Sequence, residues 1–222
     1  VRIGEKYGQQ YEDYINEKLS NYEIIWIREP IHDNVKLQWN KMFPMSLTIN
    51  EPVCVVDIDI ILLNNYSMLF DYPIKKGEFL SIPSWWINSR DYSINGGFFK
   101  YFPSDCNYIY DKFMSNIEYW QTYYIKNGIT IGPVNGEQHF VEDSVKEKLK
   151  LKLIPASWVT RWSNGYDMTH TQFAKWHFDI NQKYCELTGN EYLYIDKFHE
   201  DIKLVHFTHA QNKPIINNSN SS

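Results

Sequence analysis

Two aspartates stand two residues apart inside an apolar stretch and are the strongest candidates for chemistry. Asp57 and Asp59 lie in the sequence VCVVDIDIILL, residues 53–63. If this stretch is one strand, side chains at positions i and i+2 point to the same face, so the two carboxylates meet. Like charges beside buried surface are costly unless a cation neutralises them, and oxygen ligands of this kind suit Mn²⁺ or Mg²⁺. The spacing therefore predicts a divalent-metal site, with two solvated carboxylates at a strand end as the alternative.

A histidine near the end of the chain is a candidate third ligand. His206 follows Leu204 and Val205, and an imidazole nitrogen at a strand end can bind a Mn²⁺-type ion. His209 is close in sequence and competes for the same role. Lys213 follows and supplies a positive charge suited to a phosphate. The alternative for each histidine is an ordinary core or surface residue.

A pair of glycines follows an asparagine in the sequence SINGGFF. Gly96 and Gly97 let a backbone approach a ligand closely, and the amide of Asn95 can hydrogen-bond a hydroxyl-rich substrate. An ordinary turn is the alternative interpretation of this segment.

A second polar segment, NGEQ, opens a predicted helix. Glu137 and Gln138 can orient a sugar, stabilise positive charge or act as a base, and Glu142 and Asp143 follow on the same helix. Favourable electrostatics at a helix N-terminus would equally explain acidic residues at these positions.

The elements that position these residues follow from hydrophobic periodicity. The pattern predicts a strand–helix–strand opening, which favours a parallel α/β sheet, and makes residues 53–63 the buried central strand. The expected helices cover residues 11–19, 37–47 (broken near Pro44), 105–127 and 137–149. The other expected strands cover residues 1–4, 23–27, 78–82 and 203–207, and residues 93–101 are expected to form a glycine turn followed by a strand. We expect one domain over residues 1–212, with a nucleotide-binding half to about residue 100 and an acceptor half from there to 212, followed by a polar tail at 213–222.

Composition excludes several classes of protein. The chain has 22 Lys and Arg against 27 Asp and Glu, a net charge of −5, which argues against a nucleic-acid binder. No apolar run reaches the roughly 18–20 residues that span a membrane. Its three cysteines show no CxxC spacing and the start of the chain shows no signal peptide, so we expect reduced thiols and a cytoplasmic location.

The order of these motifs resembles that of metal-dependent glycosyltransferases of the GT-A fold. That family combines a nucleotide-binding β-α-β unit, a strand ending in DxD, an Asn/Gly sugar-pocket segment, an acidic/amide loop and a late HF…KP motif. The corresponding sequences here are VRIGEKYG, VCVVDIDI, INGGFFKY, NGEQ and VHFTHAQNKP, and WNKM looks like the W-x-K element that several such enzymes place before DxD. The resemblance implies a mostly parallel mixed sheet flanked by helices.

The resemblance also implies a role for each site residue. Asp57, Asp59 and His206 would hold Mn²⁺ or Mg²⁺, with Asp57 also close to the ribose or diphosphate of the donor. The other implied contacts are Lys213 with the diphosphate, Gly4, Tyr7 and Lys41 around the nucleoside, and Asn95, Gly96, Gly97, Glu137 and Gln138 around the transferred sugar. The late motif is closest to that of glycogenin-like retaining enzymes, although the gap from His206 to Lys213 is one residue longer and His209 replaces a usual glycine.

The aromatic content, 17% of residues, and the segment NGGFFKY look most like amino-terminal glycosyltransferase domains encoded by chloroviruses. This resemblance implies transfer of a glucose- or rhamnose-type sugar from a UDP-sugar to a glycan of the viral capsid protein, in the host cytosol.

A mechanism follows from the chemistry of sugar–phosphate cleavage. The metal and Lys213 would stabilise the leaving diphosphate, and Glu137 or Gln138 would stabilise the sugar or supply a nucleophile. We expect retention, with the leaving phosphate taking the acceptor's proton; in an inverting path Glu142 or Asp143 would be the base. Tryptophans at 85–86 and 158–162 are plausible walls for the acceptor.

Two other functions fit the same residues. In a haloacid-dehalogenase-type phosphatase, Asp57 would be the nucleophile and Asp59 the general acid. A sugar- or nucleotide-binding module would bind the same ligands without turnover.

Overall fold

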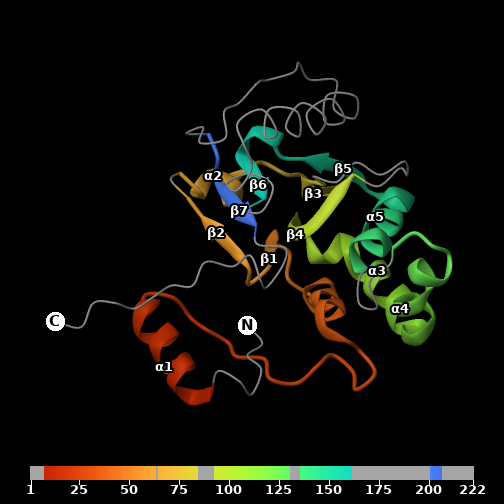
Figure 1. Ribbon diagram of the computed structural model, residues 1–222, viewed down its shortest axis with the longest axis horizontal. Coiled ribbons are helices and arrows are strands. Elements are labelled where there is room, and N and C mark those ends of the chain that lie inside the picture. Colours follow the sequence, from red (N-terminus) through yellow and green to blue (C-terminus); the bar gives the residue numbers. More distant parts are fainter. Residues whose placement is uncertain (1–7, 64, 85–92, 131–135, 162–200, 207–222) are drawn as a thin grey trace.

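Two β-sheets form the framework of the computed structural model, which describes residues 8–63, 65–84, 93–130, 136–161 and 201–206 (Figure 1). The larger sheet has the order β1-β4-β3-β5, and its strands are β1 (Val53–Val56), β4 (Ile94–Tyr101), β3 (Glu78–Pro83) and β5 (Lys150–Leu153). The smaller sheet has the order β2-β7-β6, with β2 (Ile60–Leu62), β7 (Leu204–His206) and β6 (Val159–Arg161). The pairs β1/β4, β3/β4 and β2/β7 are antiparallel, whereas β3/β5 and β6/β7 are parallel. The α/β class with mixed sheets is confirmed, although antiparallel pairs are the majority among the described strands.

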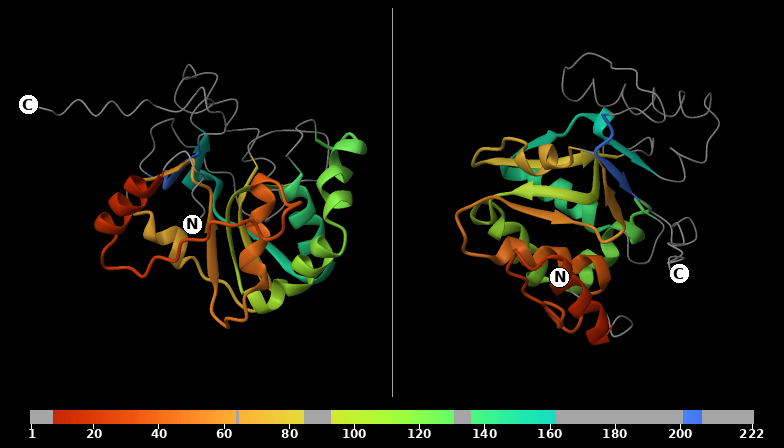
Figure 2. Two further views of the ribbon diagram at one scale, coloured as in Figure 1. Left: turned by 90° about the horizontal axis from the view of Figure 1, so that it is seen from below. Right: turned by 90° about the vertical axis from the view of Figure 1, so that its left-hand side faces the viewer.

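Helices gather on one side of the larger sheet (Figures 1 and 2). They are the 3₁₀-helix η1 (Leu37–Ser46), α3 (Pro103–Ser115), α4 (Ile117–Lys126) and α5 (Glu137–Lys148). Aromatic packing joins them, because Trp39 of η1 stacks on Phe113 of α3 at 5.0 Å and also contacts Phe140 of α5. This packing holds η1 and α5, which both carry candidate site residues, against β4. Two short elements, α2 (Ser67–Asp71) and η2 (Ala156–Trp158), complete the described fold.

The first helix, α1 (Gly8–Lys18), lies apart from the other helices (Figure 1). The segment after it was expected to form a strand at residues 23–27, and this prediction is wrong, because no strand is present there. Side chains of this segment bond back to α1 instead: Arg28 pairs with Glu12, and Trp26 Nε1 donates to Asn16 Oδ1. Trp26 is thus joined to α1 by a hydrogen bond and Ile25 is exposed to solvent, so this apolar run belongs to no sheet.

The expected central strand over residues 53–63 is also wrong as one strand. It divides into β1 and β2, which pair with β4 and β7 in different sheets, and Asp57 and Asp59 lie in the turn between them. Within the described residues β1 pairs on one side only, so it is an edge strand and not the centre of the sheet. A continuous apolar run has no period that reveals such a break.

Other expected elements agree with the structure except in detail. The helices expected near residues 11–19, 37–47 and 137–149 and the strands near 78–82 and 203–207 are confirmed, although the second helix is of the 3₁₀ type around Pro44. The single helix expected over 105–127 breaks at Asn116, whose side chain accepts a hydrogen bond from Tyr119 N and caps α4. Residues 94–101 form strand throughout, so the glycines lie within the strand and not in a turn before it. Of the described helices, none combines the length and the apolar character that crossing a membrane requires.

Candidate active site

Three candidate metal ligands converge where the two sheets meet. Asp57 N donates to the carbonyl of Gly97 at 3.0 Å, which fixes the first carboxylate beside β4. His206 pairs with Ile60 in the β2/β7 register, so it stands next to Asp59. His206 Nε2 lies 3.3 Å from Asp59 Oδ1 and 3.7 Å from Asp57 Oδ2. The aspartates were expected to meet as i and i+2 of a strand; they meet because a turn and β7 bring them together.

The donor set of these residues fits a Mn²⁺-type ion. One ligand atom from each of Asp57, Asp59 and His206 lies within 4.8 Å of the others. Two hard carboxylate oxygens and one imidazole nitrogen are a mixed set that suits Mn²⁺ better than the all-oxygen shells of Mg²⁺. Burial by itself lowers the pKa of His206, but hydrogen bonds and charge from Asp57 and Asp59 outweigh it and the net pKa is raised. The same two carboxylates that favour a proton on His206 would thus favour a metal cation.

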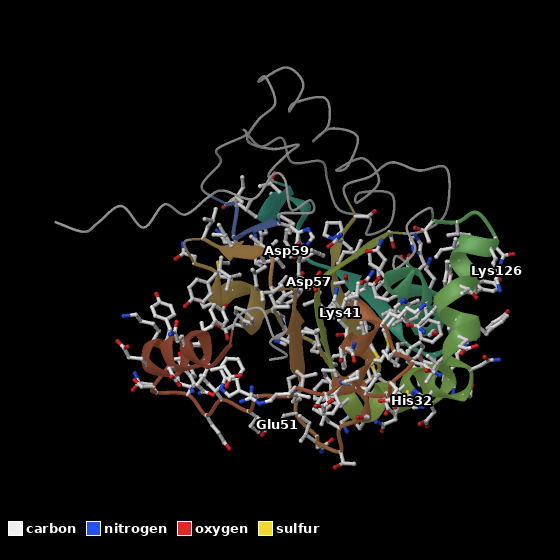
Figure 3. All side chains as sticks on the ribbon, turned by 60° about the horizontal axis from the view of Figure 1, so that its bottom comes forward. His32, Lys41, Glu51, Asp57, Asp59 and Lys126 are labelled. Atoms are coloured by element: carbon white, nitrogen blue, oxygen red, sulfur yellow. The ribbon has the colours of Figure 1, made fainter. Side chains whose placement is uncertain are left out.

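A lysine joins this cluster to the start of α5. Lys41 Nζ lies 2.6 Å from Asp57 Oδ1, 2.9 Å from the carbonyl of Gly96 and 3.4 Å from Glu137 Oε1. Figure 3 shows Lys41, Asp57 and Asp59 in succession near the centre of the molecule. Burial alone would lower the pKa of Lys41, but the carboxylates of Glu137 and Asp57 reverse this effect and raise it. The resemblance to GT-A enzymes implied a place for Lys41 near a nucleoside; its contacts here lie between the candidate metal site and the candidate sugar pocket.

Replacing Lys41 with methionine is expected to destabilise the protein strongly. The change removes the cation between Asp57 and Glu137, whose side chains are 23% and 7% exposed, and leaves two largely buried carboxylates without it. Breaking one partner from a buried ion pair costs about 3–5 kcal/mol. Thermal unfolding measures the loss, with Lys126→Met as a control, because Lys126 is exposed at the end of α4, away from Lys41 (Figure 3). Equal melting temperatures for the two variants would contradict the role given to Lys41.

The paired glycines make room for side chains of the site. A Cβ at Gly96 would lie 2.6 Å from Glu137 Oε1 and 3.3 Å from Lys41 Nζ. A Cβ at Gly97 would lie 3.2 Å from His206 Nε2 and 2.8 Å from Asn95 Oδ1. The sequence predicted that these glycines leave room for a ligand. In the structure, the space beside them is occupied by side chains of the protein itself, those of Glu137, Lys41, Asn95 and His206.

The amide side chains near the glycines hold the backbone of β4. Gln138 Oε1 accepts a hydrogen bond from Gly96 N at 3.1 Å, and Asn95 Oδ1 accepts one from Gly97 N at 2.8 Å. Glu137 is the first residue of α5 and follows Gly136, whose φ of 139° is rare for other residues. The structure thus brings Asn95, Glu137 and Gln138 to the same short stretch of β4.

Two carboxylates considered as bases are engaged inside the protein. Glu142 is fully buried, and it accepts hydrogen bonds from Ser93 N, Ser93 Oγ and Ile94 N. Asp143 accepts a hydrogen bond from Tyr124 Oη at 2.8 Å. The sequence did not predict the link between Glu142 and Ser93, because 49 residues separate the two and nothing in either segment indicates the other as its partner.

The remaining candidates fall outside the described residues or pack within the protein. Trp158 lies edge-on to Tyr72 with ring centres 5.8 Å apart, so this ring is half-buried packing. The candidates that the described residues do not include are Gly4, Tyr7, His209, Lys213 and the tryptophans at 85, 86 and 162.

Comparisons with known proteins concern the fold. No family model and no curated protein matches the chain. Among solved structures, it is similar to the glycosyltransferase GlyE of Streptococcus pneumoniae TIGR4, with a TM-score of 0.57 and 13% identity over 92% of this chain and 46% of that one. The apo form of GlyE gives a TM-score of 0.56 and 13% identity over 92% and 45% of the two chains. The chain therefore spans about half the length of these structures and shares their fold.

Proposed function

We propose that this protein is a metal-dependent glycosyltransferase that moves a hexosyl group from a UDP-sugar to a glycan acceptor. The observation that supports this most strongly is the Asp57, Asp59 and His206 cluster, which stands beside Lys41 and Glu137 in a glycosyltransferase fold. Mn²⁺ is the proposed ion because one of the three ligands is an imidazole. The chlorovirus resemblance extends the proposal to a glucose- or rhamnose-type donor and a viral capsid glycan, made in the host cytosol.

The side chains divide into two groups along the proposed donor. Asp57, Asp59 and His206 would hold the metal, which when bound would supply positive charge to the leaving diphosphate. Glu137 and Gln138 stand at the sugar end, where a carboxylate and an amide favour positive charge developing on the sugar ring. Lys41 contacts Asp57 in the first group and Glu137 in the second, so it fixes their separation.

Retention is the proposed stereochemical outcome. An inverting reaction needs a carboxylate base that can reach the acceptor hydroxyl. Glu142 is fully buried and accepts a hydrogen bond from Ser93 Oγ, and Asp143 accepts one from Tyr124 Oη, so both carboxylates are hydrogen-bonded within the protein. In the retaining path the leaving phosphate itself takes the acceptor's proton, and no such carboxylate is required.

The contacts of Asp57 speak against the phosphatase alternative. A phosphatase nucleophile needs a carboxylate oxygen that can approach phosphorus. One oxygen of Asp57 is 2.6 Å from Lys41 Nζ, and the other is 3.7 Å from His206 Nε2. The arrangement suits a metal ligand better than a nucleophile.

Calorimetric titration with UDP, GDP and CMP, each with and without Mn²⁺, tests the proposal. We expect UDP to bind only with Mn²⁺, and GDP and CMP to bind weakly or not at all. Release of UDP from UDP-glucose would then distinguish an enzyme from a module that only binds. Absence of nucleotide binding under every condition would refute the proposed function.

A further inference from the structure

The strand that carries Gly96 and Gly97, β4, changes its pairing register with β3 beside the candidate site. In the β3/β4 ladder Ser81 pairs with Phe99, but the next pair is Ile82 with Asn95. Residues 96–98 are therefore extra on β4 and bulge out of the ladder with β3. Ser81 Oγ lies 3.2 Å from the carbonyl oxygens at both ends of the bulge, those of Asn95 and Phe98.

Side chains of α5 accept hydrogen bonds from backbone amides before and within this bulge. The amides of Ser93 and Ile94 donate to the carboxylate of Glu142, and the amide of Gly96 donates to Gln138 Oε1. Gln138 and Glu142 are four residues apart on α5, so they lie on the same face of that helix. One face of α5 thus serves as the hydrogen-bonding partner of β4 from residue 93 to residue 96.

Glu142 is the firmest of these attachments. Its oxygens lie 2.8 and 2.9 Å from Ser93 N, 2.6 Å from Ser93 Oγ, 3.1 Å from Ile94 N and 2.9 Å from Lys146 Nζ. The side chain is 0% exposed. A buried carboxylate with this many donors is held in one orientation, because any displacement leaves charge or amides unsatisfied.

The site tolerates little movement between α5 and β4. Glu137 begins α5, and its Oε1 would stand 2.6 Å from a Cβ at Gly96. Gln138 bonds the amide of the same glycine. Any shift of α5 along β4 therefore moves Glu137 and Gln138 relative to the metal ligands, which come from the β1–β2 turn and from β7.

We propose that Glu142 is a positioning residue that clamps the start of β4 to α5 and so fixes Glu137 and Gln138 at the sugar end of the donor. This inference rests on the proposed function and deepens it. The hydrogen bonds and ion pair described for Glu142 join it to Ser93, Ile94 and Lys146, whereas the candidate metal ligands come from the β1–β2 turn and from β7. Its loss should consequently affect sugar transfer and leave the binding of Mn²⁺ and UDP intact.

The test compares Glu142→Ala and Glu142→Gln in the full chain, with Glu147→Ala as the control on the same helix. Displacement of reacting groups by about 1 Å costs about 100-fold in rate, and we expect a loss of that order in kcat for UDP-glucose hydrolysis by Glu142→Ala. Calorimetric affinity for UDP with Mn²⁺ should remain that of the wild type. Glu142→Gln should recover most of kcat, because its oxygen can accept from Ser93 N and Ile94 N while its amide donates to Ser93 Oγ.

Three results would overturn the inference. A Glu142→Gln variant with strongly reduced kcat, whose pH–rate profile has lost its acidic limb, would make Glu142 a base. Equal losses of UDP–Mn²⁺ affinity and kcat in Glu142→Ala would show general disruption. If Glu142→Ala does not fold, Ser93→Ala removes only the hydroxyl contact, and an unchanged kcat in that variant would count against the clamp.

Amide hydrogen exchange separates failure of this inference from failure of the proposed function. Exchange at Gly96 should quicken in Glu142→Ala, with little change at Cys54 on β1, whatever the donor. Unchanged exchange at Gly96 would overturn the clamp itself. Faster exchange in a protein that binds no UDP would instead retain the clamp and refute the glycosyltransferase proposal.

Discussion

Asp59→Ala is expected to abolish Mn²⁺-dependent UDP binding while leaving the fold intact. Asp59 lies in the turn between β1 and β2, and its side chain is 22% exposed, so its loss creates no cavity in the core. It also supplies one of three ligand atoms that lie within 4.8 Å of each other. Loss of a residue that only supports a ligand costs about 10- to 100-fold in metal affinity, and loss of the ligand itself should exceed this. Calorimetry with UDP and Mn²⁺ measures the effect, and circular dichroism checks the fold.

Glu51→Ala is the matched control for this experiment. Glu51 is an exposed carboxylate a few residues before β1, and it lies well away from Asp57 and Asp59 (Figure 3). Its removal changes the net charge by the same amount as Asp59→Ala, so it separates a local loss of a ligand from a general electrostatic effect. Unaltered Mn²⁺-dependent affinity in Asp59→Ala would contradict the metal site.

Gly97→Ala is expected to damage the metal site although no ligand is changed. The new methyl would stand 2.8 Å from Asn95 Oδ1 and 3.2 Å from His206 Nε2, so the amide and the imidazole must both shift to make room for it. Overpacking of this kind costs about 1–3 kcal/mol of stability. Displacement of one ligand should also lower Mn²⁺ affinity by about 10-fold or more. Thermal unfolding and Mn²⁺ titration give the two quantities.

Gly96→Ala is the comparison that makes this prediction specific. Its methyl would meet Glu137 Oε1 at 2.6 Å and Lys41 Nζ at 3.3 Å, on the sugar side of the site. We expect Gly96→Ala to lower turnover more than Mn²⁺ affinity, and Gly97→Ala to show the opposite order. Identical profiles for the two variants would mean that the glycines do not act on separate halves of the site.

Local patterns predicted much of the fold. The helix at 137–148 and the strands at 78–83 and 204–206 follow from periodicity and β-branched runs, and the structure has them. The break of the 53–63 run was not predictable, because β1 and β2 find partners that are remote in sequence, β4 and β7. The strand expected at 23–27 is absent because the segment has no strand partner; Trp26 bonds to Asn16 of α1 and Ile25 is exposed.

The sequence indicated the residues of the candidate site better than the contacts between them. Residue chemistry indicated Asp57, Asp59 and either His206 or His209, and the structure brings Asp57, Asp59 and His206 together. The contact of Lys41 with both Asp57 and Glu137 spans up to 96 residues of sequence and has no local signature. The space that Gly97 leaves for His206 depends on tertiary packing as well. Residue type can thus indicate a metal ligand, but it cannot indicate which backbone positions must lack a side chain so that the ligand fits.

The pairing of β7 with β2 determines when, during synthesis of the protein, all three candidate Mn²⁺ ligands can come together. Asp57 and Asp59 leave the ribosome early, whereas His206 follows after nearly 150 further residues. A nascent chain can build much of the larger sheet, whose last strand ends at residue 153, before the third ligand exists. Because such long-range pairings form slowly and only after β7 has been made, we expect Mn²⁺ uptake to follow the synthesis of β7 and not that of the β1–β2 turn.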